Sequence, residues 1–142
     1  MLFIASDHAG FILKEKLKRH LLKSKIEFTD LGTNSSISVD YPDYAKILCN
    51  EVINLPNSKG ILICGTGIGM CITANRFKGI RAVLPFNIAT AKLSRSHNNA
   101  NVLCLGGRLI SYFKALLLLK TFLNTSFLNE ERHITRIEKI DN

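Results

Sequence analysis

The chain has 142 residues, the length of one ordinary domain, and can bury roughly two thirds of the surface that it exposes when unfolded. Its composition, 46% hydrophobic and 21% charged, describes a soluble globular protein, and the longest uncharged stretch, residues 60–75, is too short and too glycine-rich to cross a membrane. The net charge of +8 favours an anionic partner, but much of it lies between Lys14 and Lys25 without interleaved aromatic residues, which argues against nucleic acid and for the solvated face of a helix.

The strands and helices are predicted to alternate along the chain. Apolar runs indicate strands at residues 2–5, 26–31, 60–64, 80–84 and 102–105. Helical periodicity indicates helices over about 11–22, 40–53, from the glycines after residue 64 to about 75, and over 88–96, 111–123 and 129–140. In the second helix, Pro42 fits the first turn, and the residues expected on the inner side are Ala45, Leu48, Val52 and Ile53. This alternation predicts a single doubly wound α/β domain over residues 1–142, with a parallel sheet covered on both faces.

The most informative segment joins the third predicted strand to the next helix. Cys64 ends an apolar run and is followed by Gly65, Gly67 and Gly69. Glycines at these positions let backbone N–H groups wrap an anion, and the same field stabilises a thiolate, the form in which cysteine acts as a nucleophile or base. The spacing fits neither a dinucleotide fingerprint nor a Walker loop. Taken alone, Cys64 would more often be a buried core cysteine beside a tight turn.

The carboxyl ends of parallel strands are where ligands of such sheets bind. The polar segments after the first, third and fifth predicted strands are Asp7-His8, Cys64 to Thr66 and Gly106 to Arg108. We expect these three segments to gather along one edge of the sheet. Asp7 alone would serve equally well as a helix cap.

Two further groups of residues suggest proton transfer and phosphate binding. His97 lies in a polar cluster, residues 96–101, just before the fifth predicted strand, where an imidazole that titrates near neutral pH is a natural proton shuttle. Arg132 and Arg136 are four residues apart, so on a helix they point to one side and can hold a phosphate together, with His133 adjacent. An exposed amphipathic helix would carry such an arginine pair too.

The remaining sequence signals concern compartment and metals. The first residues lack the basic segment of a signal peptide, so we expect a cytoplasmic protein that does not bind membranes. Four cysteines, at positions 49, 64, 71 and 104, show no CxxC spacing. This pattern indicates neither a disulfide framework nor a zinc site, and we predict no metal.

Six segments, taken together and in order, carry a specific resemblance that runs nearly from end to end of the chain. They are Ala5–Phe11, Asp40–Pro42, Ile63–Gly69, Ala74–Ala82, Ser94–Asn98 and Asn101–Leu103. In these segments the chain resembles the ribose-5-phosphate isomerase B family. The resemblance implies a Rossmann-like three-layer α/β/α sandwich with a five-stranded parallel sheet and C-terminal helices. It also implies an aldose–ketose isomerase without cofactor, working on a small sugar phosphate as a homodimer with composite active sites, and leaves open whether dimers pair into a tetramer.

The resemblance also implies roles for individual residues. Cys64 would move a proton between C1 and C2 of the sugar, with Thr66 assisting. His97 would open the furanose ring, and Asp7 would lie near the ring oxygen and hydroxyls. The residues implied in substrate binding are Asp7, His8, Tyr41, Gly65, Thr66, Gly67, Ile68, Gly69, Asn98, Arg108, Arg132 and Arg136. Met70 stands where some relatives carry a glutamate base, which groups this chain with the members that use cysteine.

The reaction so implied is the interconversion of D-ribose 5-phosphate and D-ribulose 5-phosphate through a cis-enediolate, in the non-oxidative branch of the pentose phosphate pathway. One alternative is an isomerase of a six-carbon sugar phosphate, allose or galactose 6-phosphate, since relatives handle these on the same scaffold. The choice depends on pocket depth near Tyr41 and Phe86, which spacing does not reveal. The other alternative is a non-catalytic sensor of sugar phosphates or nucleotides, suggested by the glycine loop and the basic charge.

Overall fold

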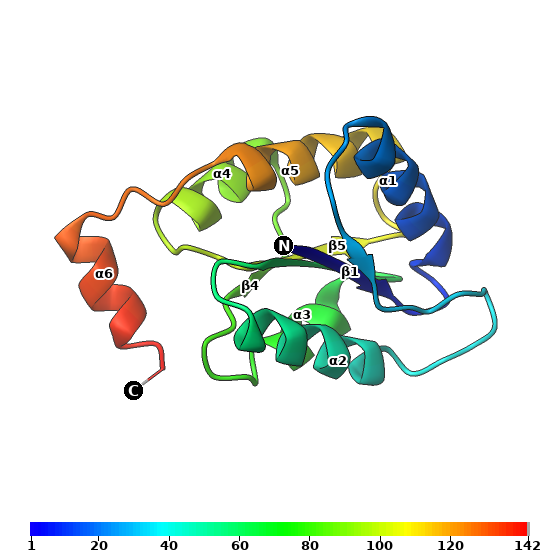
Figure 1. Ribbon diagram of the computed structural model, residues 1–142, viewed down its shortest axis with the longest axis horizontal. Helices are drawn as coiled ribbons and strands as arrows, with labels where there is room; N and C mark the ends of the chain where they lie inside the picture. Colours follow the sequence, from blue (N-terminus) through cyan, green and yellow to red (C-terminus); the bar gives the residue numbers. More distant parts are fainter. Residues whose placement is uncertain (142) are drawn as a thin grey trace.

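The computed structural model describes residues 1–141 and shows five parallel strands between two layers of helices (Figure 1). The strands are β1 (Leu2–Ser6), β2 (Thr29–Asp30), β3 (Lys59–Cys64), β4 (Ala82–Val83) and β5 (Val102–Gly106), in the order β2-β1-β3-β5-β4. The helices are α1 (Phe11–Lys23), α2 (Tyr41–Asn54), α3 (Ile68–Ala74), α4 (Ile88–Ser96), α5 (Tyr112–Asn124) and α6 (Glu131–Glu138). The predicted Rossmann-like α/β fold is therefore confirmed.

The core divides into two apolar clusters, one on each face of the sheet. Alternate residues of β1, β3 and β5 point to opposite faces, so the neighbours Ile61 and Leu62 belong to different clusters. Helices α1, α4 and α5 cover one face, and α2 and α3 cover the other (Figure 1). Because both faces are buried, the central strands are continuous apolar runs, which explains why the sequence identified them clearly.

Helix α6 stands apart from this sandwich, beyond the edge of the sheet where the parallel strands begin (Figure 1). The segment that leads to it is tied back to the end of α4, since the N–H of Leu128 donates to the carbonyl of Ser96 over 3.0 Å. This contact places α6 next to the polar cluster that precedes β5.

The two edge strands are shorter than predicted. Residues 26–31 and 80–84 were expected as strands, but β2 is only Thr29–Asp30 and β4 only Ala82–Val83. Each pairs with one neighbour only, β1 for β2 and β5 for β4, so fewer hydrogen bonds hold the flanking residues in extended ladders. On α2, Ile53 was predicted to face inward, yet it is 44% exposed because it lies near the end of the helix, beyond the sheet contact made by Val52.

The prediction of a solvated basic face on α1 is wrong for one residue. Lys14 is fully buried, on the same side of α1 as Leu17 and Leu21. Its ammonium lies 2.5 and 2.6 Å from the two carboxylate oxygens of Asp30, at the end of β2. Lys18, one turn along the helix, also contacts Asp30 at 2.6 Å. The sequence pattern could not show this, because the partner is sixteen residues away on an edge strand.

Candidate active site

The carboxyl edge of the sheet brings three of the predicted segments together. Ser6 pairs with Ile63, and Cys64 pairs with Gly106, so β1, β3 and β5 end side by side. The N–H of Asp7 donates to Ile63 O over 3.1 Å, and the N–H of Gly107 donates to Cys64 O over 2.8 Å. Asp7-His8, the Cys64 loop and Arg108 therefore share one edge, as the strand order requires.

The Cys64 sulfur lies within the turn that leads to α3. Its Sγ accepts a hydrogen bond from the N–H of Gly67 over 3.1 Å, and the side chain is 4% exposed. Gly67 has φ +80°, a left-handed conformation that glycine adopts without strain. This conformation turns the backbone so that its N–H faces the sulfur. The sulfur is thereby held in a fixed position at the start of the glycine loop.

Close packing fixes the rest of the glycine loop. A Cβ at Gly69 would lie 2.6 Å from the ring of Tyr41, and a Cβ at Gly65 would lie 3.3 Å from Nη1 of Arg108. Tyr41 and Arg108 therefore cover opposite parts of the loop, and both are exposed. Thr66 is also exposed, and its Oγ1 accepts from the N–H of Ile68 over 3.2 Å. The loop is thus rigid, with polar groups at its surface.

Asp7 and His8 are both held by backbone groups. Asp7 is 5% exposed, and its Oδ1 accepts from the N–H of Gly10 over 2.9 Å. This bond closes the turn before α1, but the N-cap residue of the helix is Gly10 and not Asp7 as the capping alternative predicted. His8 is half-buried, and its Nδ1 lies 3.2 Å from both the N and the O of Val39. The contact with Val39 was not predicted, because nothing in the sequence links residues 31 positions apart.

The second group of predicted residues lies at the opposite edge. His97 follows α4 and precedes β5, so the five-residue strand, about 16 Å at roughly 3.3 Å per residue, separates it from the Cys64 edge. Asn98 is exposed beside it, and Arg132 and Arg136 are exposed on α6. Within one chain, therefore, the structure does not bring His97, Asn98, Arg132 or Arg136 to the Cys64 loop.

His97 is paired with His133, which lies next to Arg132 on α6. Its ring stacks on that of His133, with centroids 4.4 Å apart and planes inclined by 17°. His133 is 5% exposed, and its Nε2 has no hydrogen-bond partner among residues 1–141. Loss of water and then the charge of His97 lower the pKa of His133. The stack thus fixes the orientation of His97 against α6.

The other cysteines differ from Cys64 in their surroundings. All four are free thiols. The hydrogen bond from Cys104 lowers the pKa of half-buried Cys71 to about 7, whereas burial raises the pKa of Cys49 to about 12. Over residues 1–141, no three His, Cys, Asp or Glu side chains are grouped so that they could hold a metal ion. Nor does this part of the chain contain a helix with the length and apolar character of a membrane span.

A model of the ribose/galactose isomerase family matches residues 2–140. The chain belongs to this family. It is 44% identical over 140 residues to the probable ribose-5-phosphate isomerase B of Mycoplasma pneumoniae, covering 98% of this chain and 91% of that one. It is 42% identical over 134 residues to ribose-5-phosphate isomerase B of Escherichia coli, covering 94% and 89%. The resemblance deduced from the sequence motifs is therefore confirmed.

Solved structures of family members agree with this assignment. The ribose 5-phosphate isomerase of Thermotoga maritima superposes with a TM-score of 0.95 at 54% identity, over 99% of this chain and 96% of that one. Ribose-5-phosphate isomerase B of Mycoplasma genitalium, solved with bound ribulose-5-phosphate, superposes with a TM-score of 0.91 at 42% identity, over 98% and 92%. The protein is a sugar-phosphate isomerase, and the sensor alternative finds no support in its relatives.

Proposed function

We propose that the protein interconverts D-ribose 5-phosphate and D-ribulose 5-phosphate, in the cytoplasm and in the non-oxidative branch of the pentose phosphate pathway. The observation that carries the proposal is the sulfur of Cys64, held by the N–H of Gly67 at the edge where Asp7, His8 and Arg108 converge. The names of the relatives, and the ribulose-5-phosphate bound in the Mycoplasma genitalium structure, support the choice of substrate.

In the proposed reaction, His97 first opens the furanose ring by proton transfer, with Asp7 close to the ring oxygen and hydroxyls. The Cys64 thiolate then removes the proton from C2 of the aldose. The electron pair of that C–H bond forms the C1=C2 bond of a cis-enediolate, while the π pair of the C1=O bond moves onto O1. The same sulfur returns the proton to C1, while Thr66 assists and the hydroxyl proton moves from O2 to O1. One base suffices because the two carbons are adjacent in a planar intermediate.

The remaining site residues have binding roles in this proposal. The amides of residues 65–69 stabilise the enediolate oxygen, where removal of one such donor typically costs about 2.7–4 kcal/mol. Asn98 contacts the sugar, and Tyr41 lines the pocket beside Gly69. The phosphate side consists of His8, Arg108, Arg132 and Arg136. Binding the phosphate far from C1 and C2 holds the reacting carbons in position.

The separation of the two groups of residues supports a site built from two subunits. Cys64 and His97 lie at opposite edges of the same chain, so a single chain cannot apply both to one sugar. In a two-fold symmetric homodimer, the carboxyl edge of one subunit can face the α6 end of the other, and both sites are then complete. We propose this arrangement, in which His97, Asn98, Arg132 and Arg136 belong to the subunit opposite Cys64.

The base assignment is tested by replacing Cys64 with alanine. The general base accounts for about a hundredfold or more of the rate, so we expect turnover of ribose 5-phosphate to fall at least that far while the sugar phosphate still binds. Cys71→Ser is the matched control, since it replaces a half-buried thiol in α3, seven residues further along the chain, and should retain activity. Full turnover by Cys64→Ala would refute the assignment of Cys64 as the base.

The substrate assignment is tested separately by comparing rates. In D2O, ribose 5-phosphate recovered from the wild-type reaction should contain deuterium at C2, because the proton on the base exchanges with solvent. This result would show that the protein catalyses proton transfer on ribose 5-phosphate.

The family description also names galactose, so a six-carbon sugar phosphate is the second candidate. We expect a higher kcat/KM for ribose 5-phosphate than for allose 6-phosphate or galactose 6-phosphate, and the reverse order would assign the enzyme to hexoses.

A further inference from the structure

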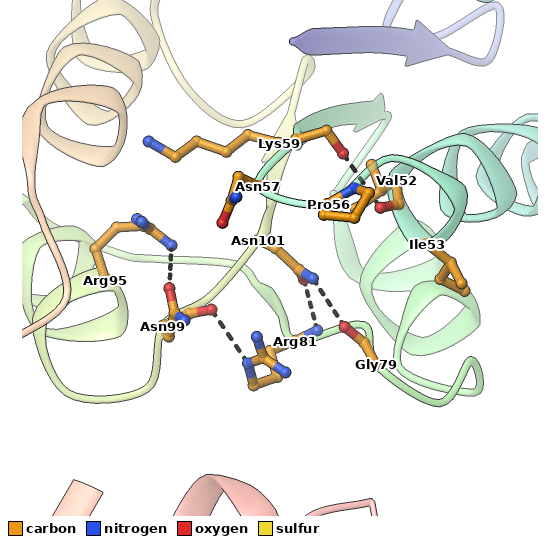
Figure 2. Close-up of a pocket in the computed structure, with 11 residues that line it drawn as sticks. Val52, Ile53, Pro56, Asn57, Lys59, Gly79, Arg81, Arg95, Asn99 and Asn101 are labelled. Carbon is orange, nitrogen blue, oxygen red and sulfur yellow. Dashed lines mark hydrogen bonds between the residues drawn. The ribbon is translucent and has the colours of Figure 1, made fainter. Parts of the chain in front are cut away.

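A hollow of about 440 Å³ lies at the amino edge of the sheet, and Figure 2 shows the residues that line it. Its walls come from the end of α2, the start of β3, the segment before β4 and the turn between α4 and β5. Neither Cys64 nor His97 lines it. The volume is within the range of small-molecule binding sites.

Three cationic side chains from different elements face this hollow. Lys59 begins β3, Arg81 precedes β4, and Arg95 lies near the end of α4 (Figure 2). The ion pairs found among residues 1–141 involve none of the three. Asp141 is the carboxylate whose charge acts on Arg81, and its Oδ1 accepts from the N–H of Gly79 over 3.1 Å.

The hydrogen bonds of the three cations go to neutral acceptors. Lys59 Nζ donates to Leu123 O over 3.3 Å, and Arg81 Nε donates to Asn99 O over 3.1 Å. Arg95 Nη1 donates to Asn99 Oδ1 over 3.0 Å and to Ala100 O. These bonds hold the side chains in place, and apart from the charge of Asp141 near Arg81 they bring no negative charge to the three cations.

The electrostatic consequence is mutual repulsion in a half-buried space. Burial, and after it the charge of Arg95, lowers the pKa of Lys59. Burial, and after it the charge of Arg81, lowers the pKa of Arg95. A multiply charged anion in the hollow would relieve this repulsion, and guanidinium groups match phosphate oxygens in geometry as well as charge.

We propose that this hollow binds a small phosphorylated metabolite with at least two negative charges, at a site separate from the proposed sugar-phosphate site. Lys59 and Arg81 contact its phosphate oxygens, and Asn101 supplies a further polar contact. Arg95 adds positive charge to the hollow without contacting the phosphate. Val52, Ile53 and Pro56 form an apolar wall on which the carbon part of the ligand rests. The proposal depends on the geometry of the hollow and not on which sugar the enzyme isomerises.

Inorganic pyrophosphate is the probe for the test, with isothermal titration calorimetry on the full chain in low-salt buffer. We expect saturable binding that weakens about tenfold in Lys59→Gln, since one charge-assisted hydrogen bond is lost, and that recovers in Lys59→Arg. Lys46→Gln removes the same charge from an exposed position of α2 and should bind like the wild type. Equal affinity in Lys59→Gln and the wild type would overturn the proposal, since it would show only a general attraction to net positive charge.

A second set of variants separates the two anion sites. Arg132→Gln combined with Arg136→Gln removes the proposed phosphate contacts of the isomerase site, and pyrophosphate should bind this variant unchanged. Loss of binding there would place the pyrophosphate in the isomerase site and overturn the proposal. If Lys59→Gln does not fold by circular dichroism, Arg81→Gln takes its place with the same expected weakening.

Discussion

At the scale of single residues, Gly67 has the most direct connection to chemistry. Gly67→Ala would place a Cβ at a backbone with φ +80° and 2.5 Å from Cδ1 of Leu84, which shifts the N–H that contacts Cys64. We expect a loss of about 1–3 kcal/mol in unfolding free energy and a large fall in kcat. Gly79→Ala is the control, because its φ of +85° carries the same strain while no atom lies within 4 Å of the added Cβ. Urea titrations and steady-state kinetics on both variants check this, and an unchanged kcat in Gly67→Ala would contradict the role of the amide.

The sequence identified the residues of the carboxyl edge because their chemistry is local. Cys64 and its glycines are contiguous, and strand order alone brings Asp7 and Arg108 beside them. The sequence did not reveal the contacts between residues that are far apart in the chain. His133 stacks on His97 across 36 positions, and Tyr41 packs on Gly69 across 28. Neither contact leaves a periodic signal in the sequence.

At the scale of elements, the buried Lys14 joins α1 to the edge strand β2 through Asp30. Asp30→Asn would leave the buried ammonium with only the carboxylate of Glu15, at 3.7 Å, and we expect a loss of about 3 kcal/mol in unfolding free energy. Lys14→Met removes both the charge and the need for a partner, so it should cost less. Lys16→Met, at an exposed position of the same helix, controls for the change in residue type. If thermal denaturation showed Asp30→Asn as stable as the wild type, the ion pair would not stabilise this edge.

The same pair predicts acid sensitivity. Burial acts to raise the pKa of Asp30, but hydrogen bonds from Lys14, Lys18 and the N–H of Gly32 outweigh it and lower the pKa below its ordinary value. A carboxyl whose pKa is lower in the folded state stabilises the fold above its unfolded pKa. This contribution is lost as pH falls through the folded pKa. Unfolding free energies measured from pH 7 downward should therefore decline more steeply for the wild type than for Asp30→Asn, and parallel curves would contradict the shift.

The core strands and the helices of the sandwich were predictable because buried parallel strands and amphipathic helices leave clear patterns in the sequence. The edge strands were overestimated, since an apolar run such as residues 80–84 does not reveal whether two neighbours or one will pair with it. Lys14 was misplaced for a related reason. A basic residue on a helix is predicted to be exposed, because the sequence does not show which acidic residue the fold will bring next to it.

At the scale of the whole molecule, the proposed composite sites predict complementation between inactive variants. Cys64→Ala and His97→Ala should each be inactive. In a dimer of one Cys64→Ala subunit and one His97→Ala subunit, each site combines Cys64 of one subunit with His97 of the other. One site therefore carries both substitutions, and the other site is intact. Random exchange of equal amounts makes half of the dimers mixed, so we expect recovery of about a quarter of wild-type activity. The mixture is assayed after co-refolding, with each variant refolded alone as the control. Complete absence of recovery would show that Cys64 and His97 do not meet across subunits.

The position of Cys71 bears on how thiol reagents act on this enzyme. With a pKa of about 7 and a half-buried side chain, Cys71 is substantially ionised at neutral pH, whereas Cys64 is 4% exposed. Iodoacetamide should therefore alkylate Cys71 first, which peptide mass spectrometry after brief labelling would reveal. In the wild type, loss of activity on alkylation could therefore result from modification of Cys71. Only in the Cys71→Ser variant would such a loss test whether Cys64 is the essential thiol.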